Sequence, residues 1–353
     1  MSMKIAIVAG GTGGHIYPAI TLAERLKKEG NEIVFFGSND RMEKTVIPET
    51  GFKFIGMDIK STAGGLVGKA KSLVSLVDGY FKSRKLLKGF DMAIGFGNYI
   101  SYPVILAASH MGLKTVIHEQ NSFAGKANRA LDKVVDLVIG SYDENLKQFK
   151  NPKTLILGNP QSGKALNVEK DPEVIREFGL DPDKKTIIIF MGSLGSKSVN
   201  EKLIEFFDKC DGSYQIIYAA GKLHYENALS RVNKDYIKVV ERVDGVKLMK
   251  NCDLLVCRAG ATTLCEISAI GTPSIIIPSP YVPNNHQFFN GKALTDKNAA
   301  VMIEEKDLSG DSLKNEVDKL INDDVRLKEL ADNARKLGNP NVLDDIVKQL
   351  EML

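Results

Sequence analysis

The sequence predicts two α/β domains, each built as a doubly wound parallel sheet with helices on both faces. Short apolar runs rich in β-branched residues alternate with helical patterns along the chain, and this alternation is typical of parallel sheets. The runs are apolar throughout, as in the segment TIIIF at residues 186–190, which is expected of strands that helices cover on both sides. Because 353 residues exceed the size at which a single core keeps growing, two domains of ordinary size are expected.

The boundary between the two domains is expected where turn-forming residues precede a charged stretch, at Gly158, Asn159, Pro160 and Gly163. We therefore assign residues 1–160 to the first domain and residues 161–339 to the second. A last amphipathic segment, residues 340–353, follows a Gly-Asn-Pro break, and its pattern alone does not say on which domain it packs. Both halves open with a strand, a glycine-bearing loop and a helix, which predicts two similar domains facing a cleft.

Composition and charge limit the classes of function. The formal net charge of +3 lacks the concentrated basic excess of a nucleic-acid-binding surface, so no nucleic-acid partner is expected. The N-terminus lacks the apolar core of a signal peptide, and the sequence has no uncharged apolar stretch of about 18 residues to span a bilayer. The cysteines form no CxxC pair, so we expect neither a zinc site nor disulfides but buried thiols at Cys210, Cys252, Cys257 and Cys265.

A glycine-rich turn, GGTGGH at residues 10–15, follows the first strand and precedes a helix that Pro18 announces. Its backbone N–H groups and the helix N-terminus favour an anionic or strongly polar ligand. A dehydrogenase would place GxGxxG here, with an acidic residue about 20 residues later, near the place where Asp40 lies. Ile16 occupies the position of the third glycine, which weakens the dinucleotide interpretation. A turn with only a structural role is the remaining alternative.

Two polar features of the first domain are candidates for catalysis or binding. His15 lies where the first helix begins, and the reference pKa of histidine near neutrality suits a general base, although a histidine that only caps the helix is an equal alternative. A polar run follows TVI at the end of a strand, where open α/β sheets bind ligands, and it comprises His118, Glu119, Gln120 and Asn121. A solvated loop is the alternative for this run.

The second domain has its own candidate site for a diphosphate. Residues 257–263, CRAGATT, follow a strand and lead into a helix, so that small residues and a helix N-terminus meet there. Glu266 lies about one turn inside this helix, where it either accepts hydrogen bonds from a ribose diol or only complements the helix dipole. An amide-rich loop further along the chain suits the recognition of sugar hydroxyls, through Asn284, Asn285, His286, Gln287 and Asn290.

Residues 66–88 predict contact with an anionic membrane surface, because they combine basic and apolar side chains in one helical segment. The basic residues are Lys69, Lys71, Lys82, Arg84, Lys85 and Lys88. The apolar residues are Leu66, Leu73, Leu76, Tyr80 and Phe81. An ordinary domain helix with a solvated lysine face is the alternative.

Five motifs, in this order and spacing, resemble those of the MurG family: GGTGGHIYPA, FGNYISYP, HEQNSFAGKANR, CRAGATTLCE and PNNHQFFN. The resemblance extends from Lys4 to the final helix. It implies an inverting UDP-N-acetylglucosamine transferase that acts on undecaprenyl-linked muramyl pentapeptide in peptidoglycan synthesis, without a cofactor or a metal. It also implies a GT-B fold of two Rossmann-like domains, with the acceptor on the first, the donor mainly on the second, and the last helix crossing back to the first.

The resemblance assigns roles to particular residues. His15 is the leading candidate for the catalytic base, with Glu119 orienting it or serving instead. Substrate contacts are implied for Thr12, Gly13, Gly14, Asn121, Ser193, Val243, Ala261, Thr262, Thr263, Leu264, Cys265, Glu266 and Gln287. In this family the diphosphate is expected on residues 261–263. Two positions depart from the family pattern, since Leu194 stands in place of a glutamine and Ser162 in place of an arginine.

The family also implies a location and a cellular role. The protein is expected to bind peripherally at the cytoplasmic face of the cell membrane, and cell-wall synthesis links the family to cell shape and cell division. Three other functions stay open from the sequence: another GT-B sugar transferase, a nucleotide-binding oxidoreductase, or a UDP-sugar-binding scaffold without catalysis.

Overall fold

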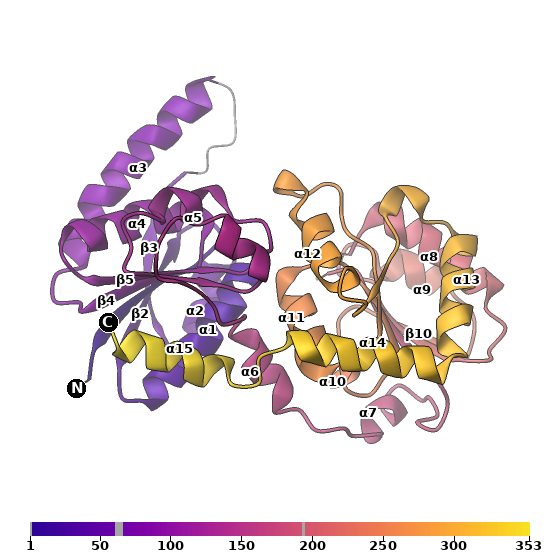
Figure 1. The fold of residues 1–353 in the computed structure, drawn as a ribbon. Coiled ribbons are helices and arrows are strands. Elements are labelled where there is room, and N and C mark those ends of the chain that lie inside the picture. The colour runs from indigo at the N-terminus through magenta and orange to yellow at the C-terminus, as the bar shows by residue number, and fades with distance from the viewer. Residues whose placement is uncertain (1, 61–65, 193–194) are drawn as a thin grey trace. The chain divides into compact units, whose positions relative to one another are not determined.

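The computed structural model of the protein describes residues 2–60, 66–192 and 195–353. Contacts between residues divide the chain into two units, the first comprising Met1–Gln161 with Asn341–Leu353 and the second Ser162–Pro340 (Figure 1). Each unit is an α/β domain built on one parallel sheet. The predicted fold class of two doubly wound domains is thereby confirmed.

The sheet of the first unit has seven strands in the order β3-β2-β1-β4-β5-β6-β7, and neighbouring strands are parallel. The chain lays β1, β2 and β3 side by side in one direction and then returns to place β4 on the other side of β1. The strands are β1 Lys4–Val8, β2 Glu32–Ser38, β3 Lys53–Met57, β4 Met92–Gly95, β5 Lys114–Glu119, β6 Leu137–Gly140 and β7 Thr154–Ile156.

Helices cover both faces of this sheet (Figure 1). Because successive residues of a strand point to opposite faces, Ile5 and Ile7 pack with α1 and α15, whereas Ala6 and Val8 pack with α4. The helices are α1 Gly13–Lys28, α2 Glu43–Glu49, α3 Leu66–Leu86, α4 Asn98–His110, α5 Lys126–Leu131, the 3-10 helix η1 Asp143–Lys147, and α15 Val342–Glu351. A short helix, α6 Gln161–Leu166, contains the point where the two units divide.

The last helix, α15, is part of the core of the first unit. Val342, Ile346 and Leu350 recur every four residues along it, and each is at most 2% exposed. They join the same apolar cluster as α1. Arg25 of α1 also forms an ion pair with Asp344, with 3.0 Å between Nη2 and Oδ1. Because this pair is largely exposed, the burial of apolar side chains is what chiefly holds α15 in place.

Helix α3 packs beside α4 through small residues. Ser72 and Ser83 are buried, and a Cβ at Gly79 would lie 3.5 Å from the ring of Pro103 in α4. The larger apolar side chains of α3 point away from the domain and are at least half exposed: Leu73, Val74, Val77 and Phe81.

Only some of the residues predicted for membrane contact are exposed. Leu76 and Tyr80 are half-buried, and the side chains of Leu66 and Lys69 lie outside the described residues. The other five basic residues of the prediction are exposed. Within the described part of the chain, no helix combines the length and the apolar character needed to cross a bilayer.

The second unit repeats the architecture with a six-stranded parallel sheet in the order β10-β9-β8-β11-β12-β13. Its strands are β8 Thr186–Phe190, β9 Gln215–Ala219, β10 Ile237–Val240, β11 Leu254–Cys257, β12 Ser274–Ile276 and β13 Val301–Met302. Its helices are α7 Glu173–Arg176, α8 Lys197–Lys209, α9 Tyr225–Arg231, α10 Gly245–Met249, α11 Ala261–Ile270, η2 Pro283–Asn285, α12 His286–Thr295, η3 Glu305–Asp307, α13 Gly310–Ile321 and α14 Asp324–Leu337.

The four cysteines, all in the second unit, are free thiols. Cys210 and Cys257 are buried as expected, whereas Cys252 and Cys265 are partly exposed residues. Burial raises the pKa of all four thiols, so they remain protonated and unreactive near neutral pH.

The strand order reverses once in each sheet, between β1 and β4 in the first unit and between β8 and β11 in the second. At such a switch point the loops that leave the two neighbouring strands run in opposite directions and open a crevice at their carboxyl ends, where α/β proteins bind ligands. The two switch points are therefore where the functional residues are expected.

Candidate functional site

The switch point of the first unit brings together the glycine loop after β1 and the start of α4. Asn98, the first residue of α4, donates a hydrogen bond from Nδ2 to the carbonyl of Gly10 at 2.8 Å. Its backbone is left-handed, with φ of 68°, a conformation that asparagine tolerates better than most residues. The imidazole of His15 lies against Gly97, since a Cβ there would be 3.4 Å from Cδ2 of His15. The two loops thus form one connected surface.

His15 lies in the first turn of α1, and the side chain of the preceding N-cap residue fixes its ring. Nδ1 of His15 is 3.0 Å from Oγ1 of Thr12. When Nδ1 carries the proton and donates it to Thr12, the basic lone pair of the imidazole resides on Nε2. An imidazole held in this tautomer can act as a general base, which is the role expected for His15. Gly13 and Gly14, also expected to contact the donor, form the start of the same helix.

The polar run after TVI is buried, not solvated. His118 and Glu119 are the last two residues of β5, and these two and Gln120 are at most 2% exposed. His118 Nε2 lies 3.0 Å from the carbonyl of Gly158, and the ring stacks on Phe96 with centroids 5.2 Å apart. Burial lowers the pKa of His118 to about 4, so it is neutral near pH 7.

Glu119 organises the loop that follows it. Its carboxylate accepts hydrogen bonds from the backbone N–H of Asn121 and Gly125, at 3.0 and 2.9 Å, and from the side-chain amides of Asn121 and Asn128, at 3.2 and 2.9 Å. Burial raises its pKa, and these hydrogen bonds oppose that rise. Asn128 also approaches Gly97, since a Cβ there would be 3.5 Å from its Nδ2. Glu119 is therefore linked to the neighbourhood of His15, because Asn128 contacts both Glu119 and Gly97, and Gly97 lies against the ring of His15.

The switch point of the second unit carries an uncapped helix N-terminus. Helix α11 begins at Ala261 with Gly260 as N-cap, no side chain accepts from its first N–H groups, and its first turn has no acidic residue. The N–H groups of residues 261–263 have no partner within the helix, as helix geometry requires. In the described structure Oγ1 of Thr262 is buried and has no hydrogen-bond partner. Donors without acceptors at a helix N-terminus favour an anion, such as a diphosphate.

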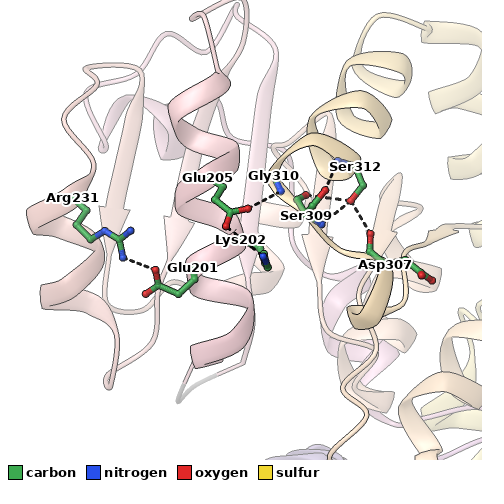
Figure 2. A network of polar contacts seen from close by, with 8 residues as sticks. All are labelled: Glu201, Lys202, Glu205, Arg231, Asp307, Ser309, Gly310 and Ser312. Carbon is green, nitrogen blue, oxygen red and sulfur yellow. Dashed lines mark hydrogen bonds and ion pairs between the residues drawn. The ribbon is translucent and has the colours of Figure 1, made fainter.

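Three other helices of the second unit, α10, α13 and α14, close their N-termini with side chains. Asp244 caps α10 and Asp323 caps α14 by accepting from backbone N–H groups. Figure 2 shows the closure of α13, where Ser309 accepts from Ser312 and the carboxylate of Glu205 accepts from the N–H of Gly310 at 3.3 Å. Helix α11 has no such cap, and neither do α8, α9 and α12. What marks the start of α11 is the buried Oγ1 of Thr262, which has no hydrogen-bond partner in the described structure.

Arg258 ties together the loops around α11. It leaves the end of β11, and its guanidinium donates to Oγ of Ser196 at 2.7 Å and to the carbonyl of Ile277 at 3.1 Å. The same guanidinium lies 2.6 Å from the carboxylate of Glu305, and both side chains are only 10% exposed. The loops that follow β8, β11 and β12 are thus fixed to one another beside the start of α11.

The remaining predicted binding residues of this unit lie at or near α11 and in two other loops. Leu264 and Glu266 are buried in α11, and the thiol of Cys265 donates to the carbonyl of Thr262. Oε1 of Gln287, in α12, accepts from the N–H of Ser279 at 2.8 Å. Val243 lies half-buried in the loop before α10. Ser193 and Leu194 lie outside the described residues.

Sequence reasoning missed several residues that shape these sites. Asn98, Asn128 and Arg258 stand inside the recognised motifs, yet no role was assigned to them, because their contacts join segments far apart in the chain. Glu43 was missed entirely. The acidic residue singled out after β2 was Asp40, which is exposed, whereas Glu43 is fully buried beneath the glycine loop.

A metal centre finds no support in the described residues, where no group of three or more histidine, cysteine, aspartate or glutamate side chains is placed to hold an ion.

Two parallel α/β domains with switch-point sites are the architecture of the GT-B fold, and comparison with known proteins adds that the chain is a glycosyltransferase. The N-terminal domain of glycosyltransferase family 28 matches residues 5–139, and the C-terminal domain of the same family matches residues 186–349. A crystal structure of MurG from Acinetobacter baumannii superposes with a TM-score of 0.83 at 25% identity, covering 99% of this chain and all of that one. A UDP-N-acetylglucosamine 2-epimerase from Listeria monocytogenes shares the fold, with a TM-score of 0.72 at 15% identity, covering 98% of this chain and 95% of that one.

Curated relatives match over the whole chain. A protein of Halothermothrix orenii is 37% identical, covering 99% of this chain and 98% of its own, and one of Bacillus subtilis is 34% identical, covering 99% of each. Both are named UDP-N-acetylglucosamine–N-acetylmuramyl-(pentapeptide) pyrophosphoryl-undecaprenol N-acetylglucosamine transferase. The chain belongs to this MurG family of glycosyltransferases, as its motifs predicted.

The buried His118 predicts a pH dependence of stability. Between its unfolded pKa near 6.5 and its folded pKa of about 4, the unfolded chain binds a proton that the folded protein does not, so the free energy of unfolding falls as the pH falls through this window. The raised pKa of Glu119 acts in the opposite direction, because there the folded state binds the proton more readily. Replacing His118 isolates the histidine contribution.

When the pH is lowered from about 7 to about 5, we expect the melting temperature of His118→Gln to fall by less than that of the unaltered protein. Thermal unfolding at several pH values measures this, and the quantity compared is the change with pH, not the melting temperature at one pH. Equal changes in the two proteins would show that His118 does not titrate as its burial requires.

Proposed function

We propose that the protein transfers N-acetylglucosamine from UDP-N-acetylglucosamine to the 4-hydroxyl of undecaprenyl-pyrophosphoryl-N-acetylmuramyl pentapeptide, with inversion at the anomeric carbon. The names of the full-length relatives support these substrates. The observation that carries the proposal is the open N-terminus of α11 at the switch point of the second unit, with its unsatisfied donors. Such a site fits the diphosphate of a nucleotide sugar.

The donor is assigned mainly to the second unit. Residues 261–263 would hold the diphosphate, helped by Ser193, while Leu264, Cys265 and Glu266 would surround the ribose. Val243 would meet uracil through its backbone, and Gln287 would bind hydroxyls of the sugar. From the first unit, Thr12, Gly13, Gly14 and Asn121 would face the donor sugar.

The reaction needs one base and one stabilised leaving group. The acceptor oxygen O4 attacks the anomeric carbon, the bond from that carbon to the diphosphate oxygen breaks, and UDP departs with the electron pair. Nε2 of His15 takes the proton from O4. The N–H groups at the start of α11 stabilise the charge that develops on the diphosphate, which is electrostatic preorganisation. Glu119, with its oxygens occupied by four donors, serves as a positioning residue through Asn128.

Transfer of labelled N-acetylglucosamine to the lipid-linked muramyl pentapeptide tests the proposed function directly. We expect transfer by the unaltered protein and a kcat lower by about 10²- to 10⁴-fold in His15→Ala, with little change in the affinity for UDP-N-acetylglucosamine, as for loss of a general base. His110→Ala is the matched control, because His110 is an exposed histidine of the same unit with no part in the site.

No transfer under any lipid condition would overturn the proposed function. Transfer with unchanged kcat in His15→Ala would keep the function and remove His15 as the base. The oxidoreductase alternative has its own test, since a ligand that binds only the folded state raises the melting temperature. We expect UDP-N-acetylglucosamine to raise it and NAD to leave it unchanged.

We also propose that α3 binds the protein peripherally to an anionic membrane at the cytoplasmic face, where the lipid-linked acceptor would be met. What supports this is an inversion of the usual pattern of burial. The fully buried positions of the helix include serines, Leu76 and Tyr80 are only partly buried, and Val74 and Phe81 are 70% and 58% exposed. Exposed basic residues accompany them, among them Arg84 and Lys85. Apolar side chains flanked by cations are typical of helices that lie in the interface of an anionic bilayer.

Binding to vesicles that contain phosphatidylglycerol tests the role of α3. We expect both the apolar double variant Val74→Ser with Phe81→Ser and the charge reversal of Lys82, Arg84 and Lys85 to weaken binding, the latter because each basic residue near an anionic surface contributes about 1 kcal/mol. Val325→Ser is the control, because Val325 is an exposed apolar residue of the second unit. Unaltered binding in both α3 variants would exclude the helix as the membrane contact.

A further inference from the structure

Glu43 is a buried carboxylate without a cation. It is the first residue of α2 and is 0% exposed. None of the ion pairs among the described residues includes it, so its charge is stabilised by hydrogen bonds and by the N-terminus of its own helix, α2. Because burying a charge without an opposite charge is costly, such a group persists in a protein only where its hydrogen bonds hold something in place.

The hydrogen bonds of Glu43 end on the glycine loop and on β2. Oε2 accepts from the N–H of Gly11 at 3.1 Å. Oε1 accepts from the N–H and the hydroxyl of Ser38, at 3.0 and 2.5 Å. The loop is built to admit the carboxylate, since a Cβ at Gly10 would lie 2.4 Å from Oε1. Glycine is therefore required at position 10 for steric reasons.

Asn98 holds the loop from a second direction. Its Nδ2 donates to the carbonyl of Gly10, and a Cβ at Gly11 would lie only 2.0 Å from that nitrogen. Gly11 has a φ of +89°, which side chains rarely adopt. The peptide group between these two glycines is thus fixed at both polar atoms, its N–H by the carboxylate of Glu43 and its carbonyl by the amide of Asn98. Four residues later along the chain comes His15.

In nucleotide-binding α/β proteins a glycine loop after the first strand directs its N–H groups at a ligand phosphate. Here the N–H of Gly11 is already bonded to a carboxylate of the protein itself. A phosphate approaching this loop would find that donor occupied and a negative charge beneath it.

We propose that Glu43 anchors the N-terminal glycine loop by accepting from the N–H of Gly11, and thereby positions the segment that carries Thr12 and His15. Glu43 touches no reacting atom, so it is a positioning residue. The role in turnover rests on the proposed sugar transfer, whereas the role in placing His15 does not.

Glu43→Gln tests the proposal at constant side-chain shape. The amide oxygen can still accept from Ser38, but the amide nitrogen then opposes the N–H of Gly11, and that hydrogen bond is lost. We expect kcat to fall about 10- to 100-fold, the scale for a displaced catalytic group, while the KM for UDP-N-acetylglucosamine stays within about twofold. A KM that rises at unchanged kcat would overturn the proposal, because the loop would then bind the donor.

Glu205→Gln is the matched control. It breaks the same kind of hydrogen bond, from a glycine N–H to a glutamate carboxylate, at the start of α13, where no site residue follows (Figure 2). Ser38→Ala is a second control, because it removes one hydrogen bond from Glu43 and leaves the one to Gly11. We expect the kcat of both control variants to stay within about twofold of the unaltered protein, even if their melting temperatures are lower. Loss of kcat that merely follows loss of melting temperature in all three variants would overturn the proposal.

Nuclear magnetic resonance of the five histidine rings provides a readout that needs no turnover, with the signal of His15 assigned through His15→Ala. We expect the ring signals of His15 to shift or broaden in Glu43→Gln and to stay in place in Glu205→Gln. Unmoved signals would contradict the positioning role even if the protein transferred no sugar. If Glu43→Gln does not fold, Glu43→Asp, which keeps the charge but draws it back from Gly11, takes its place in the same measurements.

Discussion

The reversal of strand order beside β1 and beside β8 is the constraint on which the rest of the structure depends. Parallel strands buried on both faces leave only their ends for function, and at the reversal the loops from neighbouring strands separate. In the first unit this places the glycine loop against the start of α4, and in the second it places Arg258 and the start of α11 beside the loop after β8. The topology thus determines where both sites lie, and individual side chains then determine what each site can bind.

The two switch points differ in how they treat negative charge. In the first, a buried glutamate already accepts from the glycine loop. In the second, the N-terminus of α11 has no capping side chain and no acidic residue in its first turn, and Oγ1 of Thr262 is buried there without a hydrogen-bond partner in the described structure. Helix N-termini and glycine loops attract anions in general, so the side chains that fill some of them decide where a ligand anion binds. Under the proposed function, this difference favours the second unit for the donor diphosphate and leaves the first unit to present a base to the acceptor.

Sequence patterns predicted the alternation of apolar strands with helices, the fold class and the family, because these depend on local apolar runs and on contiguous motifs, but they did not predict β3, β7 or β13. They also placed α11 correctly at a strand end. They did not predict that His118 and Glu119 are buried, because a polar run at the end of a strand has the same pattern whether it meets solvent or the protein interior. Nor did they find Glu43, whose partner Gly11 lies 32 positions earlier in the chain, or the outward direction of the apolar side chains on α3. Such features arise from tertiary packing, which no local pattern encodes.

The central claim is that a nucleotide diphosphate binds at the start of α11 and not at the glycine loop of the first unit. Hydrogen–deuterium exchange of the full chain, with and without UDP, tests it most directly, because a bound diphosphate slows the exchange of the N–H groups that it accepts from. We expect UDP to slow exchange in residues 260–266 and to leave residues 10–15 unchanged. Slowed exchange at residues 10–15 with no change at residues 260–266 would contradict the claim.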